Sequence, residues 1–100
     1  MTYPRCGYLY RLSNLIQLQR EPWETTPRRG NNGYVEEGEL VTVLNVALKP
    51  WSGTVCNEVV IEVEVLVAGT GHRGYLFFAG DGERSIRNLF VAVSETHPHP

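Results

Sequence analysis

The residues of this chain that could do chemistry are few, and they are spread along its 100 positions. Glu62 and Glu64 alternate on one side of a valine-rich segment, which places them about 7 Å apart if the segment is a strand. Paired carboxylates at a comparable spacing can serve general acid and base catalysis. The competing interpretation, which we adopt, is that both glutamates form the solvent-exposed face of a strand.

Nucleophilic catalysis has equally little support. A hydrolytic site needs a nucleophile, a base and an orienting group that converge in one pocket. Cys56 and His72 are a conceivable nucleophile and base, but nothing in the sequence brings them together. We therefore expect no catalytic residues and no enzymatic activity.

Metal-ligating residue types are also sparse. Cys6 and Cys56 lie outside any CxxC motif, and two thiols alone cannot complete a zinc site. They are either idle thiols or partners in a disulfide. His97 and His99 alternate with prolines in the last residues, which is typical of a disordered tail. We expect no bound metal.

A glycine pattern occurs over residues 69–74, where Gly69, Gly71 and Gly74 reproduce the string GxGxxG. This motif binds phosphate when it follows a strand and opens a helix. Here it joins two segments that are expected to be strands, so the glycines indicate a hairpin loop. The sequence accordingly predicts no cofactor.

Aromatic residues in polar or Pro/Gly-bounded segments are the stronger functional signal. Trp23, Tyr34 and Trp51 lie in such segments, and Tyr75 follows the hairpin glycines. Tyrosine and tryptophan dominate the energetics of protein interfaces. We expect Trp23, Tyr34 and Trp51 to line one groove for a protein or peptide partner, with Tyr75 as a further binding residue. The alternative is that these rings cover the ends of a barrel.

The basic residues support a second function less strongly. The net charge is −2, whereas duplex DNA-binding domains are usually basic. Arg28 and Arg29 form the one local cluster and belong either to a solvated loop or to a contact with an acidic partner. A nucleic-acid-binding barrel would require these two to converge with Arg73, Arg84 and Arg87.

The elements that must position these residues are predicted to be strands. Apolar and polar residues alternate along segments rich in Val, Ile, Tyr and Phe, and Gly or Pro bounds most of them. We expect no convincing helix, only a single 3₁₀ turn over 85–88. The expected strands span 7–18, as one strand or as two joined by a bend at Ser13–Asn14, and then 39–48, 59–67, 73–78 and 89–93.

Two details of this arrangement are specific. Residues 20–38 are expected to form a long loop after the first strand, with a tight turn near Asn32–Gly33. In the 59–67 strand, the glutamates fix the register, because burying unpaired carboxylates costs several kcal/mol each. Ile61 and its alternate neighbours then face the core. Val60 and Leu66 are expected on the outer face, where they could support a homo-oligomer.

Short motifs in this order resemble those of the bacterial SH3-like barrels. Residues 38–44 (GELVTVL) are similar to the step that opens the second strand of that family, and 71–76 (GHRGYL) are similar to its distal hairpin. The 59–67 and 89–93 strands complete a match over about residues 38–95. The resemblance implies an all-β, five- to six-stranded SH3-like barrel with a long loop after the first strand. Its domain would cover residues 1–95, with 96–100 as a disordered tail.

These observations favour a non-enzymatic protein–protein interaction or assembly module, either free-standing or part of a larger phage-like or mobile-element particle. The nucleic-acid-binding small barrel is the alternative. No apolar run reaches the roughly 18 residues of a membrane span. The first residues also lack the apolar core of a secretory signal. We therefore expect no membrane association and a cytoplasmic location.

Overall fold

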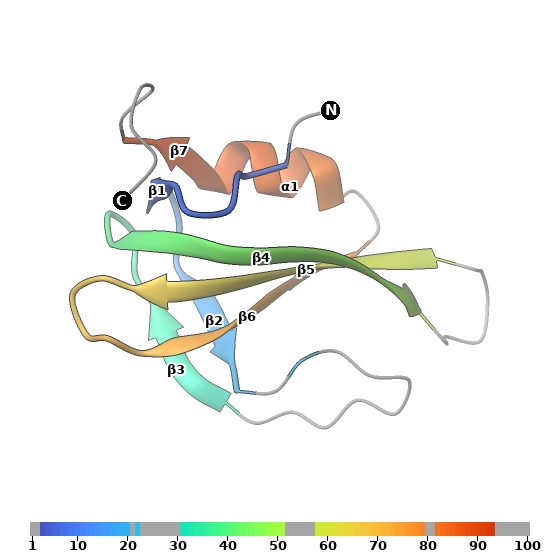
Figure 1. Cartoon of the computed structure of the whole chain (residues 1–100), viewed down its shortest axis with the longest axis horizontal. Helices are drawn as coiled ribbons and strands as arrows, with labels where there is room; N and C mark the ends of the chain where they lie inside the picture. Colours follow the sequence, from blue (N-terminus) through green and yellow to red (C-terminus); the bar gives the residue numbers. More distant parts are fainter. Residues whose placement is uncertain (1–2, 21, 23–30, 52–57, 80–81, 94–100) are drawn as a thin grey trace.

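The computed structural model describes residues 3–20, 22, 31–51, 58–79 and 82–93. Within these residues the chain forms seven strands and one short helix (Figure 1). In chain order they are β1 (Leu9–Leu12), β2 (Ile16–Gln19), β3 (Asn31–Val35), β4 (Leu40–Trp51), β5 (Glu58–Val67), β6 (Arg73–Phe78), α1 (Gly82–Leu89) and β7 (Phe90–Ala92).

The strands form one antiparallel sheet in the order β3-β2-β6-β5-β4-β1-β7. β4, β5 and β6 are consecutive neighbours, whereas β1 lies between β4 and β7 and β2 lies between β6 and β3. Because β1 and β2 are joined by only a short bend, opposite parts of the sheet are held close together, and the sheet curls. The core inside it takes residues from every strand and from α1.

Gly74 permits the closest approach in this curled sheet. A Cβ atom at this position would lie 2.5 Å from the Leu18 side chain and 2.6 Å from the Gln19 carbonyl oxygen. β2 pairs with β6 at the adjacent residue, where Gln19 is opposite Tyr75. Only a residue without a side chain lets the two strands meet here.

The predicted bend in the first strand is confirmed. β1 and β2 are separated by a bend at Ser13–Asn14, and Leu12 and Leu18 are both fully buried. The turn predicted near Asn32–Gly33 is wrong, because these residues lie in β3, which pairs with β2. Gly33 has a positive φ of 93° beside an irregularity in that pairing. It therefore serves a distorted strand instead of a tight turn.

The turn in this region comes later. Gly38 has a φ of 90°, and the Glu39 backbone N–H donates to the Glu36 carbonyl oxygen at 3.1 Å. The Glu36 backbone N–H also donates to the Glu39 carboxylate at 2.8 Å. The long loop expected over residues 20–38 is thus partly strand and partly this turn. Its residues 21 and 23–30 lie outside the described residues.

β4 is longer than the sequence predicted. It was expected to end before Lys49, but its pairing with β5 continues through Lys49, Pro50 and Trp51. β1 pairs with Leu40–Thr42, so among the described residues the far part of β4 has a strand neighbour on one side only. Proline, which lacks an N–H, is tolerated at such an edge.

The core register predicted for β5 is confirmed, because Ile61, Val63, Val65 and Val67 are all buried in the core. The exposure predicted for the opposite face is wrong at two positions. Val60 is fully buried and Glu62 is only 4% exposed. The Glu62 carboxylate lies 3.7 Å from the Lys49 ammonium, an ion pair that offsets part of the cost of burying the charge.

The other residues of this outer face are less buried. Glu64 is partly exposed and lies 3.5 Å from the Arg73 guanidinium, and Leu66 is half-buried. With Val60 buried, the outer face of β5 is not the open apolar surface that was expected to support self-association.

The expectation of a single 3₁₀ turn over residues 85–88 is also wrong, because α1 is an eight-residue α-helix. Ile86 and Leu89 are buried on its inner side. Glu83 in the first turn and Arg87 in the last turn complement the helix dipole. Packing against the core stabilises a helix that would be too short to form alone.

The predicted all-β class is confirmed, and the predicted count of five to six strands is wrong, because the sheet has seven. The two-part first strand and β3 account for the difference. The tail expected over residues 96–100 lies outside the described residues. Within the described part of the chain, no helix has both the length and the apolar character that a bilayer crossing requires.

Candidate functional site

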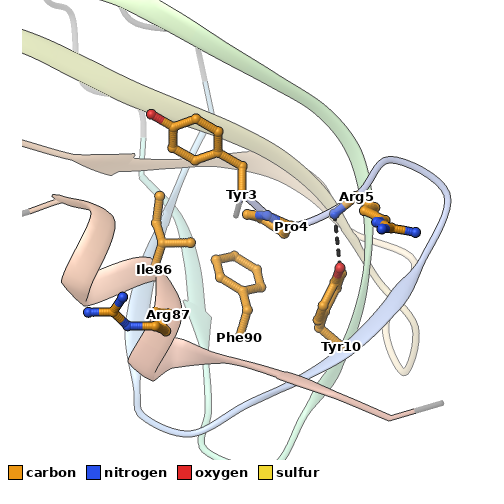
Figure 2. Close-up of a pocket in the computed structure, with 7 residues that line it drawn as sticks. All are labelled: Tyr3, Pro4, Arg5, Tyr10, Ile86, Arg87 and Phe90. Atoms are coloured by element: carbon orange, nitrogen blue, oxygen red, sulfur yellow. Dashed lines mark hydrogen bonds between the residues drawn. The ribbon is translucent and has the colours of Figure 1, made fainter. Parts of the chain in front are cut away.

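A pocket of about 230 Å³ lies where the N-terminal segment packs against α1 and the start of β7. We call it the Tyr10–Phe90 pocket, after the two rings at its floor. Figure 2 shows the seven residues that line it: Tyr3, Pro4, Arg5, Tyr10, Ile86, Arg87 and Phe90.

The floor joins two aromatic rings that are far apart in the sequence. Tyr10 belongs to β1 and Phe90 is the first residue of β7, and these strands pair directly. The ring centroids lie 5.7 Å apart at an interplanar angle of 84°, an edge-to-face arrangement. The Phe90 ring also lies 6.2 Å from the ring of Phe78 in the core. The floor is therefore continuous with the core and is held rigidly.

Backbone hydrogen bonds hold the N-terminal segment over this floor. The Arg5 N–H donates to the Tyr10 hydroxyl at 2.9 Å, as Figure 2 shows. Two residues later, the Gly7 N–H donates to the Val43 carbonyl at 2.7 Å. Gly7 has a φ of 86°, which glycine adopts without steric cost. The chain therefore turns at Gly7, between the segment of residues 3–5 that covers the pocket floor and the start of β1. In that segment Pro4 is buried and Tyr3 is half-buried.

The charges around this pocket are positive. The Arg5 guanidinium lies 5.6 Å from the centroid of the Tyr8 ring, within the range of a cation–π contact. Figure 2 shows the Arg5 and Arg87 side chains on opposite sides of the pocket, both pointing away from its centre. Among the described residues that line it, none is Asp or Glu. Within the described residues, no ion pair or hydrogen bond engages the Arg87 guanidinium.

This arrangement suits binding. The pocket volume is below the roughly 300–1,000 Å³ of typical small-molecule sites, so it matches a single side chain of a partner. Aromatic faces and the Ile86 side chain can pack against an apolar group. The arginines at either side can form charge-assisted hydrogen bonds with carboxylates next to that group.

A second pocket, of about 400 Å³, lies on the opposite face of α1. Ser85, Asn88 and Leu89 of the helix line it, whereas Ile86, Arg87 and Phe90 border the first pocket. With 3.6 residues per turn, the two sets diverge to either side of the helix, with Ile86 and Leu89 next to each other on its buried face. We call it the Leu15 pocket. Its other lining residues come from β6, from the bend between β1 and β2, and from the start of β2: Phe78, Ser13, Asn14, Leu15 and Ile16.

Half of the predicted binding residues cannot be placed. Trp23, Arg28 and Arg29 lie outside the described residues. Trp51 ends β4, opposite Glu58, but its side chain is not described either. The predicted groove of Trp23, Tyr34 and Trp51 therefore stays a prediction.

Tyr34 and Tyr75 lie on either side of β2. Tyr34 in β3 is opposite Gln17 and is 60% exposed. Tyr75 in β6 is opposite Gln19 on one side and Glu64 on the other, and it is half-buried. Burial raises the pKa of the Tyr75 hydroxyl, and the negative charges of Glu64 and Glu62 raise it further. Neither tyrosine lines the Tyr10–Phe90 pocket or the Leu15 pocket.

The arginines of the predicted nucleic-acid surface belong to different elements. Arg73 lies in β6, where its guanidinium is 3.5 Å from the Glu64 carboxylate. Arg84 and Arg87 lie on α1, and of these two only Arg87 lines the Tyr10–Phe90 pocket. The pairing of Arg73 with Glu64 leaves less of its charge for phosphates.

Metal-ligating residue types are scattered in the described part of the chain. Among the residues described, no group of three or more His, Cys, Asp or Glu is placed to hold a metal ion. Cys6 is a free, exposed thiol, whereas Cys56 lies outside the described residues. Because the Cys6 thiol is free, the predicted disulfide alternative is not formed in this structure, and Cys6 agrees with the idle-thiol alternative.

Sequence reasoning missed most of the Tyr10–Phe90 pocket. Tyr3, Pro4 and Phe90 were not singled out, and Arg87 was assigned only to the nucleic-acid alternative. The helical spacing of Ile86, Leu89 and Phe90 was an available signal for a helix with one apolar face. No local signal links residues 3–5 to this helix, because the contact depends on the path of the chain around Gly7.

Comparisons with known proteins give no identification. The chain matches no protein-family model, no curated protein and no solved structure. Its function must therefore be argued from its own residues.

Proposed function

We propose that this chain is a non-enzymatic protein-interaction module built on an SH3-like barrel. In the proposed activity, the Tyr10–Phe90 pocket receives one large apolar side chain of a partner protein. Carboxylates on either side of that side chain pair with Arg5 and Arg87. The observation that carries the proposal is an aromatic pocket the size of one side chain, with a guanidinium on each side and no acidic side chain among the described residues of its lining.

The order of strand pairing supports the barrel assignment. β1 pairs with both β4 and β7, and β4, β5 and β6 form a meander. A short helix separates β6 from β7, and the β2–β3 hairpin occupies the long connection between β1 and β4. This order agrees with the SH3-like resemblance of residues 38–95. Sheet curvature of this kind presents the segments between strands as binding surfaces.

The electrostatics support an acidic partner. The whole chain carries a net charge of −2, so attraction of an acidic segment depends on the local field. Arg5 and Arg87 supply a local positive field, and such a field raises association rates and excludes basic competitors. Edge-to-face rings at the floor provide a rigid apolar surface that loses little entropy on binding.

A synthetic peptide tests this proposal directly. The probe has a central phenylalanine with two aspartates on each side, and its matched control has lysines instead of the aspartates. We expect the aspartate peptide to shift the NMR resonances of Tyr3, Tyr10 and Phe90, and the lysine peptide to leave them unchanged. Shifts centred on Tyr34 and Tyr75 would instead place the binding site around β2 and contradict binding in the Tyr10–Phe90 pocket.

Matched variants separate local charge from net charge. Arg87→Gln should weaken aspartate-peptide binding about fivefold, the size of a contact worth about 1 kcal/mol at an exposed position. Arg11→Gln removes the same net charge from an exposed arginine outside the pocket lining and should leave the affinity unchanged. Isothermal titration calorimetry measures both. Equal losses in the two variants would show that only net charge matters.

The nucleic-acid alternative predicts different behaviour. A single-stranded oligothymidylate would bind by base stacking and phosphate contacts, with a steep dependence on salt. If it binds at low salt while the aspartate peptide does not, the nucleic-acid function replaces the one proposed.

A further inference from the structure

The Leu15 pocket has a different character from the proposed binding site. The described residues of its lining are four apolar and four neutral polar ones, and none of these eight is charged. Leu15 lies at the pocket and is 57% exposed, whereas Leu89 in the same lining is buried. A projecting apolar side chain and an apolar hollow therefore lie next to each other on one surface.

Hydrogen bonds keep Leu15 in this projecting position. The Ser13 hydroxyl donates to the Asn88 carbonyl oxygen at 2.6 Å, and the Ser13 N–H donates to the Leu89 carbonyl oxygen at 2.9 Å. These bonds tie the bend between β1 and β2 to the end of α1. The Leu15 N–H donates to the Asn14 side-chain oxygen at 3.0 Å. The bend is thus fixed before any partner arrives, which lowers the entropic cost of binding.

The neutrality of the described lining residues favours a second copy of the chain as the occupant. In a two-fold symmetric dimer each patch meets its own copy, so a charged patch would repel itself. The polar residues of this lining are Ser13, Asn14, Ser85 and Asn88. Serine hydroxyls and asparagine amides both donate and accept hydrogen bonds, so these groups can pair with their counterparts in an identical patch. The Tyr10–Phe90 pocket, with an arginine on each side, cannot do so.

We infer that a second copy of this chain occupies the Leu15 pocket, in a two-fold dimer in which Leu15 of each copy enters the pocket of the other. A standard interface buries about 800 Å² per partner, roughly an eighth of the 6323 Å² surface of this chain. The Leu15 pocket forms only the centre of such an area. The dimer is therefore weak, and its population depends on protein concentration.

Sedimentation equilibrium from micromolar to millimolar protein tests the dimer. The unaltered chain should change from monomer to dimer over this range. Leu15→Asp should raise the dissociation constant at least a hundredfold, or about 2.8 kcal/mol, because both copies lose a buried leucine and gain a carboxylate. The matched control is Leu48→Asp, since Leu48 is also 57% exposed but lies on β4. It should leave the dissociation constant unchanged.

A mixing experiment tests the specific contact. Ser85→Trp fills the pocket while leaving Leu15 intact, so neither this variant nor Leu15→Asp can form a contact between identical copies. In a mixture of the two, the intact Leu15 of one chain can enter the intact pocket of the other. The mixture should therefore dimerise at least tenfold more tightly than either variant alone.

Three outcomes would overturn the inference: a monomer at millimolar concentration, equal effects of Leu15→Asp and Leu48→Asp, or no recovery on mixing. Each is distinguishable from failure of the proposed function, because the peptide experiment reports on the other face of α1. Circular dichroism of each variant verifies that the fold is retained.

Discussion

The two faces of α1 border pockets with opposite chemistry. On one face, Ile86, Arg87 and Phe90 contribute to a small aromatic pocket with positive charge at its sides. On the other face, Ser85, Asn88 and Leu89 contribute to a larger, uncharged pocket next to an exposed leucine. One eight-residue helix thus borders two surfaces of different charge. In the two proposals made above, the charged side binds an acidic segment of another protein and the neutral side binds a second copy of the chain.

We expect Phe90 to contribute most to the stability of the Tyr10–Phe90 pocket. Phe90→Ala should lower the free energy of unfolding by about 3–5 kcal/mol, because the ring is buried and contacts both Tyr10 and Phe78. Urea denaturation followed by circular dichroism measures this loss. Phe90→Leu keeps most of the buried volume and should cost far less. If both variants are equally unstable, the edge-to-face geometry matters more than the volume.

The close approach of β2 and β6 at Gly74 has the next largest expected effect on stability. Gly74→Ala places a methyl group within 3 Å of Leu18 and the Gln19 carbonyl oxygen. Separating β2 from β6 should cost about 1–3 kcal/mol by overpacking. Because β2 and β6 carry Ile16 and Phe78, the Leu15 pocket should be disturbed more than the Tyr10–Phe90 pocket.

Comparison of the NMR shifts around the two pockets checks this difference. Gly69→Ala is the control, since a Cβ atom at Gly69 has no neighbour within 4 Å. If the two alanine substitutions destabilise the protein equally, the close approach of β2 and β6 is not the reason why position 74 needs glycine.

The sequence predicted the strands of the sheet better than the burial of their outer faces. β5 was predicted correctly because apolar side chains alternate with glutamates over a long segment, which allows one register only. β3 was missed because Asn32–Gly33 is a strong local turn signal, and pairing with β2 overrode it. The burial of Glu62 was missed because its partner Lys49 lies on another strand. Local patterns identify strands, but tertiary contacts decide their outer faces.

Neither pocket had a sequence signature. α1 has only eight residues, and each pocket beside it is completed by residues that lie far from the helix in the sequence. Residues 3–5 reach one face through the turn at Gly7, and Ser13 fixes the β1–β2 bend to the other. The aromatic residues chosen from the sequence were those in polar segments. The rings that form the pocket floor, Tyr10 and Phe90, belong to the strands β1 and β7 and were not among the predicted binding residues.

A smaller effect on stability is expected from substitution of Ser13. Ser13 lines only the Leu15 pocket, so the substitution should affect one pocket and not the other. Ser13→Ala removes the hydrogen bond to the Asn88 carbonyl oxygen, so the free energy of unfolding should fall by about 0.5–1.5 kcal/mol. The bend that carries Leu15 becomes less ordered, so dimerisation should weaken. Binding of the aspartate peptide should not change. Loss of peptide affinity in this variant would mean that the two faces of α1 are coupled.

The smallest effect is expected from Tyr75, which lines neither pocket. Burial, followed by Glu64 and Glu62, raises the pKa of Tyr75 above the ordinary value of 10.0. The folded state therefore retains this proton at pH values where the unfolded chain releases it. The stabilisation is fully present below pH 10 and decreases as the pH rises through the folded-state pKa.

Urea denaturation between pH 9 and 11.5 measures this loss, with Tyr75→Phe as the comparison. Because all other titrating groups are common to both proteins, the difference in their stability isolates Tyr75. The unaltered chain should lose stability more steeply than the variant in this range. Parallel curves would contradict the raised pKa. Since Tyr75 does not line the Tyr10–Phe90 pocket, peptide binding measured at the same pH values should not follow this difference. If it does, β6 transmits the titration to that pocket.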